Sequence, residues 1–372
     1  MNQLFILFCA LSPLQVQIDA IAQKGGGTLT LERGEYVTGA LFFKKGVNLH
    51  LKAGATIIGS NRAEDYPITS TRIEGETCDY YPALINADHC DGFKISGEGV
   101  IDGHGANTWE EFWTTRDQAR KEGREVRNKD FMRPRVLYVS NSKNVDISGV
   151  TFKNSKFWTT HFYNCEHVLV HDTKIIAEIL KDKHGKELKG PSTDAIDIDK
   201  CHDFTVRNAL ISVNDDGVVI KGGKGNWAND YKKHPENGPS DKVLVENCTF
   251  LSPTHSCLTL GSECTEAKNI VMRNCKVDGA GNLLCLKMRT DTPQHYEKVL
   301  VERCEGNCRS LLNMKPWKQY AVFNRPVEEL KSFAKDITIQ DCSLKTKKAI
   351  DIVRDDEVYT CENLTLRRNQ DR

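Results

Sequence analysis

Short stretches of alternating apolar and polar residues, separated by glycine or asparagine, run along most of this chain. The stretch KNVDISGVTF (143–152) is echoed by EHVLVHDTKI (166–175), HDFTVRNALI (202–211), DKVLVENCTF (241–250), KNIVMRNCKV (268–277), EKVLVERCEG (297–306) and KDITIQDCSL (335–344). Apolar residues at every second position are typical of β-strands. The interval between first apolar positions runs from 23 residues (Val145 to Val168) to 39 residues (Phe204 to Val243). Repeats of this size predict an all-β solenoid, a right-handed parallel β-helix in which each repeat forms one coil.

One segment near the start departs from this alternation. Residues 14–24 (LQVQIDAIAQK) place apolar side chains at a helical spacing, and three glycines follow them. Such a segment predicts a short helix that ends at the glycines. We expect this N-terminal helix to cap the exposed end of the solenoid.

Four polar segments lengthen the coils that contain them. They are residues 104–134, 178–190, 224–240 and 315–331. Loops on a rigid scaffold tend to carry binding and catalytic residues, so we expect these insertions to wall a cleft. No linker separates them from the repeats, and residues 1–372 are predicted to form a single β-helix domain.

Composition and charge exclude some classes of function. The chain has 51 Lys and Arg against 51 Asp and Glu, so its formal net charge is zero and nothing indicates a nucleic-acid partner. No apolar run approaches the roughly 20 residues of a membrane span. We expect a monomer without a membrane-spanning segment.

The 14 cysteines show no metal-binding or disulfide spacing. Six of them fall at repeated points of the coils, which suits small buried side chains that stack on one another. These are Cys165, Cys201, Cys248, Cys275, Cys304 and Cys342. Disulfide pairing is left open by the sequence.

The first residues allow two interpretations. Residues 1–12 contain an apolar run from Leu4 to Leu11 that ends at Ala10-x-Ser12, a pattern of short secretory signals. However, no Lys or Arg precedes the run and Pro13 follows the expected cleavage point, so a buried first strand is the alternative. The first interpretation makes the protein secreted or periplasmic.

Three aspartates lie on two neighbouring repeats. Asp194 in GPSTDAIDID precedes the pair Asp215–Asp216 in NDDGVVIKGG by 21 and 22 residues, which is about one coil. Stacked coils would bring the three carboxylates to one face, where crowding raises the pKa of at least one of them. A proton donor beside an ionised base is what hydrolysis of a glycosidic bond needs. The alternative is that these aspartates are solvated turn residues.

Two further motifs follow at coil-like intervals. THSCLTLGSE contains His255, and LKMRTDTPQHY contains Lys287 and Arg289. If one coil takes roughly 25–35 residues, these side chains lie on the same side of the solenoid as the three aspartates. Their common order and phase argue against a chance scatter of charged residues.

The order of these motifs resembles the pectin-degrading polygalacturonase family, glycoside hydrolase family 28. The resemblance covers nearly the whole chain, from GGGTLTLERGEYVTGAL through SGEGVIDGHG and RPRVLYVSNSKNVDISGVTFKNSKFW to the four motifs. The family's series NTD, DD, GHG and RIK becomes STD (192–194), DD (215–216), THS (254–256) and KMR (287–289) in this chain. The departures from the family pattern are typical of a divergent bacterial branch.

The resemblance implies a role for each catalytic candidate. Asp215 would be the general acid that protonates the leaving oxygen. Asp194 and Asp216 would hold and deprotonate the attacking water, so that the reaction inverts the configuration of the sugar. His255 would support the protonation of the acid, with a satisfied core histidine as the alternative. The resemblance implies no metal and no cofactor.

The same resemblance points to residues that bind an acidic sugar. Lys287 and Arg289 match the basic pair that receives a substrate carboxylate, and a structural salt bridge is the alternative for them. Ser192 stands where the family has Asn, so a polar contact at the scissile sugar is changed.

Further contacts to the sugar are expected from the strands and loops beside the cleft. Lys221 and His161 lie in stretches that the family uses near its cleft, and a structural role is the alternative for both. Trp227, Tyr231 and Trp317 could offer faces on which sugar rings stack, although aromatic residues in loops often only pack the loop.

The predicted function is inverting hydrolysis of the α-glycosidic bonds of galacturonic acid in pectin, so the expected partner is an acidic pectic oligo- or polysaccharide. We expect exo-action on oligogalacturonides, because longer cleft-side loops tend to block one end of the groove in such branches. Rhamnogalacturonan or pectin side chains are alternatives within the family. A calcium-dependent pectate lyase and a non-catalytic glycan-binding β-helix are the alternatives outside it.

Overall fold

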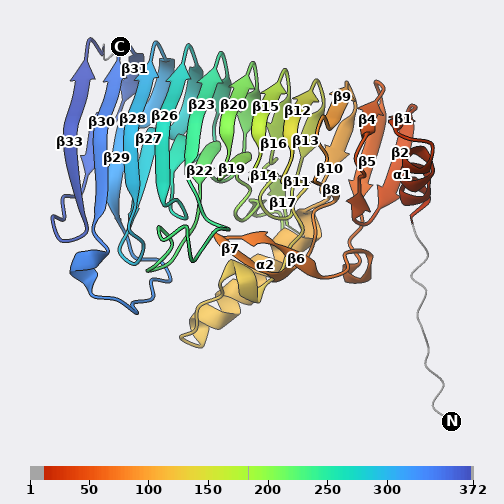
Figure 1. Cartoon of the computed structure of the whole chain (residues 1–372), viewed down its shortest axis with the longest axis horizontal. Coiled ribbons are helices and arrows are strands. Elements are labelled where there is room, and N and C mark those ends of the chain that lie inside the picture. The colour runs from red at the N-terminus through yellow and green to blue at the C-terminus, as the bar shows by residue number, and fades with distance from the viewer. Residues whose placement is uncertain (1–11, 183, 370–372) are drawn as a thin grey trace.

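The computed structural model describes residues 12–182 and 184–369, and it shows a stack of coils whose regular structure is mostly β-strand (Figure 1). Each full coil contributes one strand to each of three parallel rows, and equivalent strands of successive coils pair side by side. The repeat in the sequence is therefore the coil, as predicted. Apart from Ser12, the candidate signal segment 1–12 lies outside the described residues.

The first row is an 11-stranded parallel sheet that contains the repeated stretch of the sequence. Its strands are β1 (Gly27–Leu31), β4 (Val47–Leu51), β9 (Lys94–Gly97), β12 (Lys143–Ser148), β15 (Glu166–His171), β20 (His202–Arg207), β23 (Ser240–Glu246), β26 (Glu266–Arg273), β28 (His295–Glu302), β30 (Ser332–Gln340) and β33 (Tyr359–Arg367). Val145, Val168, Phe204 and Val243, which mark successive sequence repeats, are partners in register.

The second and third rows merge into one 18-stranded sheet, because two long strands run through both rows. The second row contains β2 (Gly34–Thr38), β5 (Ala55–Gly59), β10 (Val100–Asp102), β13 (Thr151–Lys153), β16 (Lys174–Ile176), β21 (Leu210–Ser212), β24 (Thr249–Leu251) and β31 (Ser343–Thr346). The third row contains β3 (Leu41–Phe42), β8 (Ile85–Asp88), β11 (Leu137–Ser140), β14 (Thr160–Tyr163), β19 (Ile196–Asp199), β22 (Val218–Lys221), β25 (Ser256–Leu260) and β32 (Ile350–Ile352). The strands common to both rows are β27 (Lys276–Arg289) and β29 (Glu305–Trp317).

The core fills the space that the rows enclose. In the third row, Phe162, Ile198, Ile220 and Leu260 are successive partners in register, and each is 0% exposed. Burial of apolar surface of this kind is the main favourable contribution to folding, at roughly 1.5–3 kcal/mol for each large side chain. The period-two alternation thus places one face of every strand in the core.

The repeated cysteines are buried, as expected, and they are free, but they stand at two corners of the coil and not at one. Cys165 and Cys201 precede their first-row strands, and the Cys165 amide donates to Cys201 Sγ at 3.4 Å. The other four, Cys248, Cys275, Cys304 and Cys342, follow their first-row strands. The repeat therefore accommodates a small stacked side chain at both ends of the first row.

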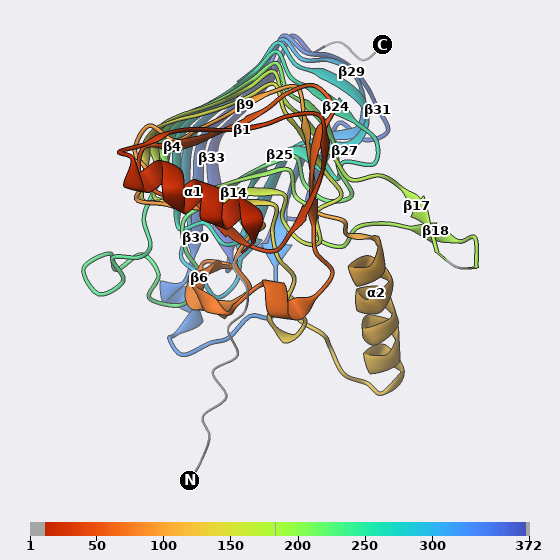
Figure 2. The same ribbon diagram turned by 90° about the vertical axis from the view of Figure 1, so that its right-hand side faces the viewer.

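The predicted N-terminal helix is α1 (Pro13–Gln23), which lies across the end of the coils (Figure 2). Ser12 is its N-cap and accepts from the Leu14 amide at 3.3 Å. The Gln15 side chain donates to the Phe42 carbonyl at 3.0 Å and accepts from the Phe42 amide at 2.8 Å. The helix thus covers the apolar end of the core and satisfies an edge strand, which is the capping role expected from the sequence.

The insertions gather along one side of the solenoid, where α2 (Ala106–Lys121) and the antiparallel pair β6 (Thr69–Ile73) and β7 (Glu76–Tyr80) lie below the coils in Figure 1. A second antiparallel pair, β17 (Leu180–Lys181) and β18 (Glu187–Leu188), projects from the same side. Three short 3-10 turns complete the elements: η1 (Ala63–Asp65), η2 (Asn128–Asp130) and η3 (Val327–Glu329). None of the helices in the described part of the chain has the length and apolar character needed to cross a bilayer.

Candidate active site

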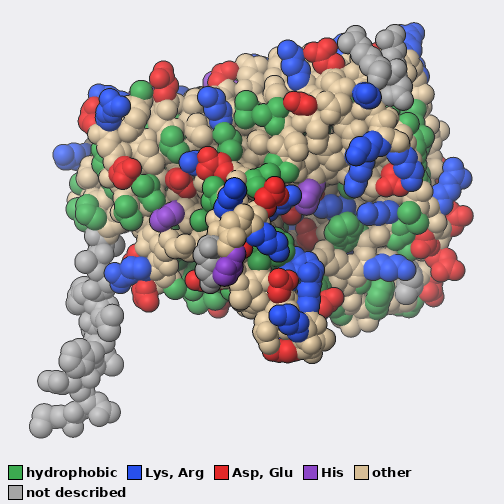
Figure 3. All heavy atoms as spheres, turned by 180° about the vertical axis from the view of Figure 1, so that it is seen from behind, with side chains coloured by type: hydrophobic (Ala, Val, Ile, Leu, Met, Phe, Trp, Pro, Cys, Tyr) green, Lys and Arg blue, Asp and Glu red, His purple; other side chains and the backbone are tan. Residues whose placement is uncertain are grey.

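A cleft of about 800 Å³ lies between the insertions and the outer face of the coils. Figure 3 shows a hollow near the middle of this side of the molecule, with Lys, Arg, His and acidic side chains around it. Its lining is strongly charged. The acidic residues that line it are Glu74, Asp194, Asp215, Asp216 and Glu263, and the basic ones are Arg116, Lys189, Lys221, His255, Lys287, Arg309 and Lys315.

The catalytic candidates occupy equivalent turns that lead into third-row strands. Asp194 lies two residues before Ile196 and Asp216 two residues before Val218, and these two strand residues are partners in register. The Ala195 amide donates to the Asp216 carbonyl at 3.0 Å, and the His255 amide donates to the Asp215 carbonyl at 2.8 Å. The β-helix therefore brings the three aspartates and His255 into one band, as the coil-length spacing predicted.

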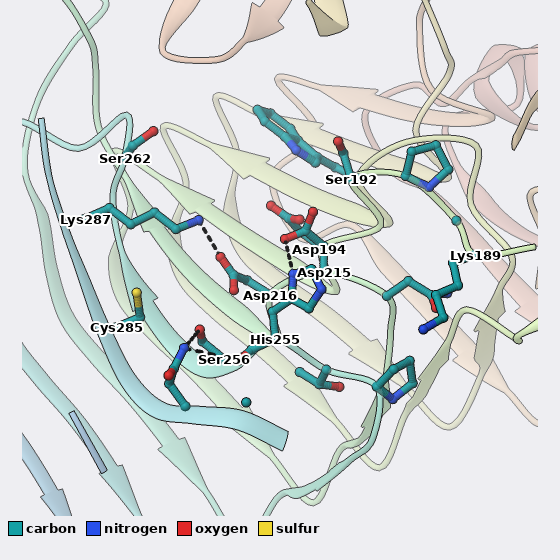
Figure 4. Close-up of a pocket in the computed structure, with 18 of the residues that line it drawn as sticks. Lys189, Ser192, Asp194, Asp215, Asp216, His255, Ser256, Ser262, Cys285 and Lys287 are labelled. Atoms are coloured by element: carbon teal, nitrogen blue, oxygen red, sulfur yellow. Dashed lines mark hydrogen bonds and ion pairs between the residues drawn. The ribbon is translucent and has the colours of Figure 1, made fainter. Parts of the chain in front are cut away.

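Two adjacent carboxylates have different partners (Figure 4). His255 Nδ1 lies 3.3 Å from Asp215 Oδ1, whereas Lys287 Nζ donates to Asp216 Oδ2 at 2.7 Å. One carboxylate oxygen from each of Asp215 and Asp216 and one ring nitrogen of His255 all lie within 4.8 Å of one another. The site thus pairs one aspartate with an imidazole and its neighbour with an ammonium group.

The surroundings also shift the pKa values of Asp194 and Asp215 in opposite directions. Burial, followed by the negative charge of Asp215, raises the pKa of Asp194 well above its ordinary value of 3.8. Burial acts to raise the pKa of Asp215 as well, but the hydrogen bond and charge of His255, helped by Lys287, outweigh it and hold this pKa below 3.8. The hydrogen bond with Asp215 in turn raises the pKa of His255 above 6.5. The surroundings therefore favour the protonated form of Asp194, and they favour an ionised Asp215 beside a protonated His255.

The rise in pKa expected for a crowded aspartate falls on Asp194 and not on Asp215, the expected acid. The physical reason is that burial dominates at Asp194, whereas a hydrogen-bonded imidazole faces Asp215. Because the two groups of a strongly coupled pair titrate together, the proton held by Asp215 and His255 belongs to both of them.

Lys221 lines the cleft but is already neutralised. Its Nζ lies 3.1 Å from Glu263 Oε2 and 3.4 Å from Asp197 Oδ1, and it sits 4.2 Å from the centre of the Trp158 ring. Burial raises the pKa of Asp197 to about 7 against the effect of Lys221. Lys221 therefore stabilises a layer of buried charge beneath the aspartates, and its reach toward a sugar is limited.

Two predicted sugar contacts are not brought to the cleft. Arg289 is 1% exposed and donates to both carboxylate oxygens of Asp291, at 2.6 and 2.8 Å. His161 is 0% exposed, its Nδ1 lies 2.6 Å from Arg135 Nη1, and burial lowers its pKa to about 3. Neither is among the described residues that line the cleft. Arg289 thus adopts the structural salt bridge that the sequence left as its alternative.

The remaining sugar-contact candidates divide between the cleft and other places. Ser192 and Trp317 line the cleft, and Ser192 Oγ donates to Asn128 Oδ1 at 3.3 Å. Trp227 lines a separate hollow, where Arg325 lies 4.3 Å from its ring centre. The Tyr231 hydroxyl lies 3.1 Å from Thr265 Oγ1 and 3.2 Å from Glu266 Oε2, so it joins its loop to the start of β26.

Sequence reasoning missed several residues that line the cleft. Trp113 and Arg116 come from α2, and nothing in the sequence shows which face of that helix turns toward the aspartates. Glu263 lies in a turn after β25 without a recognisable motif. Lys315 could have been found, because it follows Lys287 by 28 residues and is its partner in register.

The family model of Glycosyl hydrolases family 28 matches residues 45–299. Among curated proteins, a probable polygalacturonase of Vitis vinifera is 23% identical over 253 residues, which cover 66% of this chain and 46% of that protein. An exo-poly-alpha-D-galacturonosidase of Dickeya chrysanthemi is 24% identical over 287 residues, which cover 68% of this chain and 44% of that protein. The chain thus spans about half the length of the curated relatives it matches.

Solved structures share the fold over nearly the whole chain. The polygalacturonase of Erwinia carotovora has a TM-score of 0.72 at 20% identity, over 94% of this chain and 89% of that one. The exopolygalacturonase of Thermotoga maritima has a TM-score of 0.63 at 21% identity, over 94% and 86% of the two chains. These likenesses confirm the predicted right-handed parallel β-helix.

Proposed function

The chain belongs to family 28 of the glycosyl hydrolases, and from this premise we propose that it hydrolyses the α-glycosidic bonds of galacturonic acid in pectin with inversion. In this proposal Asp215 protonates the leaving oxygen, and Asp194 and Asp216 hold and deprotonate the attacking water. The same proposal makes the enzyme exo-acting on oligogalacturonides.

The observation that carries the proposal is the pairing of adjacent carboxylates with different cations in one cleft. His255 lies 3.3 Å from Asp215 and can return a proton to it, so the acid can be reloaded after each turnover. Asp216 accepts from Lys287 at 2.7 Å, which suits a carboxylate that acts on water in its charged form. Asp194 must release its proton before it can assist as a base, and an incoming anionic sugar or a bound water would change the balance that sets its pKa.

Exo-action is supported by a contact between two insertions. The Tyr320 hydroxyl donates to the Val126 carbonyl at 3.2 Å, and the Arg127 guanidinium lies 5.0 Å from the centre of the Tyr320 ring. The same two segments supply Asn128 and Gln319 to the lining of the cleft. We therefore propose that this contact closes the cleft at that side, so that the substrate is bound by its chain end.

The charge pattern favours hydrolysis over calcium-dependent elimination. Calcium is held by six to eight oxygen ligands, and an ammonium group against a carboxylate competes with it. Lys287 occupies Asp216 in this way, and burial does not discharge it, because the negative charge of Asp216 keeps its pKa above the ordinary 10.5. The aspartates are thus arranged for acid–base chemistry.

The test is a product profile on polygalacturonan, defined oligogalacturonides and rhamnogalacturonan, with Asp215→Asn beside the unaltered protein. We expect release of saturated monogalacturonate only, with its kcat lowered by about 10²–10⁴ in the variant, as for loss of a general acid. The matched control is Asp356→Asn, which removes an exposed aspartate that is not among the described residues lining the cleft and should leave kcat unchanged.

Other products would each correct a defined part of the proposal. Mixed oligomers would show an open groove and endo-action. Cleavage of rhamnogalacturonan alone would mean that the enzyme acts on a different glycosidic linkage from the one proposed. An unsaturated product that absorbs ultraviolet light would overturn hydrolysis. The acid itself is identified with an aryl galacturonide whose leaving group needs no proton: Asp215→Asn should lose far less activity on it than Asp194→Asn, and the reverse result would make Asp194 the acid.

A further inference from the structure

The basic residues that line the cleft differ in whether a carboxylate already neutralises them. Lys287 pairs with Asp216 at 2.7 Å and Lys221 with Glu263 at 3.1 Å. Lys189 lies 3.8 Å from Glu187, with both side chains largely in solvent. Within the described residues, three lining cations have no carboxylate within the 4.0 Å of an ion pair: Arg116, Arg309 and Lys315.

Lys315 is placed by the same register that places Lys287. It lies on β29 as the direct partner of Lys287 on β27, so the two side chains leave the same face of adjacent parallel strands, which are about 4.8 Å apart. Both reach the Trp317 ring, whose centre is 4.9 Å from Lys287 Nζ and 5.9 Å from Lys315 Nζ. Trp317 and Lys315 are half-buried and line the cleft.

An acidic residue that could pair with Lys315 already has other hydrogen-bond partners. Asp351, on the following coil, accepts from Asn313 Nδ2 at 2.8 Å and from Lys348 Nζ at 2.5 Å. Within the described residues, Lys315 is therefore not held in the cleft wall by a salt bridge. Its ammonium group stays available to an anion from outside the chain.

A uronic acid offers the two features that this corner can bind, a carboxylate and the flat apolar face of a sugar ring. The ammonium of Lys315 suits the carboxylate, and the indole of Trp317 suits the ring. Lys287 is engaged with Asp216, and Arg289 is buried against Asp291, so neither member of the basic pair expected from the sequence is as free as Lys315.

We propose that Lys315 and Trp317 form a binding subsite for a uronate residue, one coil beyond Lys287 and three coils beyond that of Asp216, and that Lys315 determines the preference for an anionic over an uncharged sugar there. The proposal deepens the proposed function and rests on it for the identity of the sugar. In it, Lys315 replaces Arg289 as the second carboxylate-binding cation of the cleft.

The test measures binding separately from hydrolysis. In an Asp215→Asn background, calorimetry is done with trigalacturonate and with its fully methyl-esterified form, before and after Lys315→Met. We expect trigalacturonate to bind roughly ten- to hundredfold more weakly in the double variant, the range of one charge-assisted hydrogen bond, whereas the uncharged ester changes less than about twofold. Lys315→Arg should retain most of the affinity.

The matched control is Lys318→Met, which removes an exposed lysine three residues further on that is not among the described lining residues. It should leave both affinities unchanged. Equal binding of trigalacturonate with and without Lys315, or no binding to the parent, would overturn the subsite. If trigalacturonate binds through Lys315 and the unaltered protein hydrolyses no galacturonide, the subsite stands and the proposed function fails. If the unaltered protein hydrolyses galacturonides and Lys315→Met does not alter the KM, the proposed function stands and the subsite fails.

Discussion

The two faces of β14, β19 and β22 are both largely buried, yet they are made of opposite chemistry. On the inner face, Phe162, Ile198 and Ile220 stack in register, and each is 0% exposed. One residue further along the same strands, Tyr163, Asp199 and Lys221 are partners in register on the outer face. Asp199 is 0% and Lys221 3% exposed, because the insertions cover this face.

The difference lies in how each face is stabilised. The inner face gains from apolar area removed from water and needs no specific partner. The outer face gains only where each charge meets its partner, because an unpaired buried charge is costly. Arg72 from β6 supplies one such partner, 3.2 Å from Asp199, and Glu263 supplies another to Lys221.

This solenoid therefore separates folding from function across the thickness of a single sheet. The inner face specifies the coil, and the outer face forms a charged layer on which the turns with Asp194, Asp215 and Asp216 rest.

Removing Arg72 should damage stability more than any apolar truncation of one methyl group. Arg72 is 1% exposed and also donates to Asn237 Oδ1 at 2.7 Å. Arg72→Met leaves Asp199 buried without its cation, and we expect a loss of about 3–5 kcal/mol in the free energy of unfolding, measured with urea. Asp199→Asn in the same chain should restore part of this loss, so that the double variant costs less than the two single changes added together.

The Arg72–Asp199 pair should also be sensitive to acid. Burial acts to raise the pKa of Asp199, but Arg72 and His161 outweigh it and hold the pKa below 3.8. The stability from this pair is therefore present above the ordinary pKa and lost as the pH falls through the lowered one. If Arg72→Met lowers the free energy of unfolding no more than Ile198→Val does, the charged layer does not depend on its ion pairs as described here.

The pH dependence of activity should depend on the Asp215–His255 pair. Because the pKa of His255 is raised above 6.5, the Asp215–His255 pair still holds its proton when the pH reaches 6.5. We expect kcat/KM to fall as the pH rises through that raised pKa. In His255→Gln the remaining donor is a carboxyl group, so the alkaline limb should move to lower pH by about one unit or more. His89→Gln is the control, because His89 makes a similar contact with Asp88 at 2.8 Å on an exposed turn. An unmoved limb in His255→Gln would show that another group holds the proton.

A small change on the inner face should cost stability and leave the chemistry intact. Ile198→Val removes one methylene group from the core, and we expect a loss of about 0.5–1.5 kcal/mol in the free energy of unfolding. The kcat/KM of the folded variant should be unchanged, although Asp197 and Asp199 flank the substitution. A fall in kcat/KM would mean that the two faces are coupled more closely than this comparison allows.

The sequence predicted the inner face well, because its period-two pattern and its repeat length follow directly from stacking coils. It also predicted the band of turns that carry the catalytic candidates, since residues one coil apart must lie side by side. The outer face could not be predicted to the same degree. Lys287 and Arg289 share a strand face by alternation, yet only the first reaches the cleft, because Asp291 holds the second at the end of β27.

The remaining errors share one cause, which is that a strand pattern does not show which outward positions an insertion will cover. His161 lies outward on β14 and would face a ligand on a bare solenoid, but Arg135 and the covering loops enclose it. Trp227 is the opposite case, since its loop turns it into another hollow. Such outcomes depend on contacts between distant insertions, and no local sequence signal records them.

The contact between Tyr320 and Val126 has a consequence for the order of events in turnover. If the cleft is closed there as proposed, the released sugar and the shortened chain share one exit, and the chain must withdraw before the small product can leave. Such an enzyme works distributively, releasing its polymer after every cut, and accumulated monosaccharide slows it by occupying the closed side of the cleft. Opening that contact would let the polymer remain bound and slide after each cut, so that the enzyme would act processively.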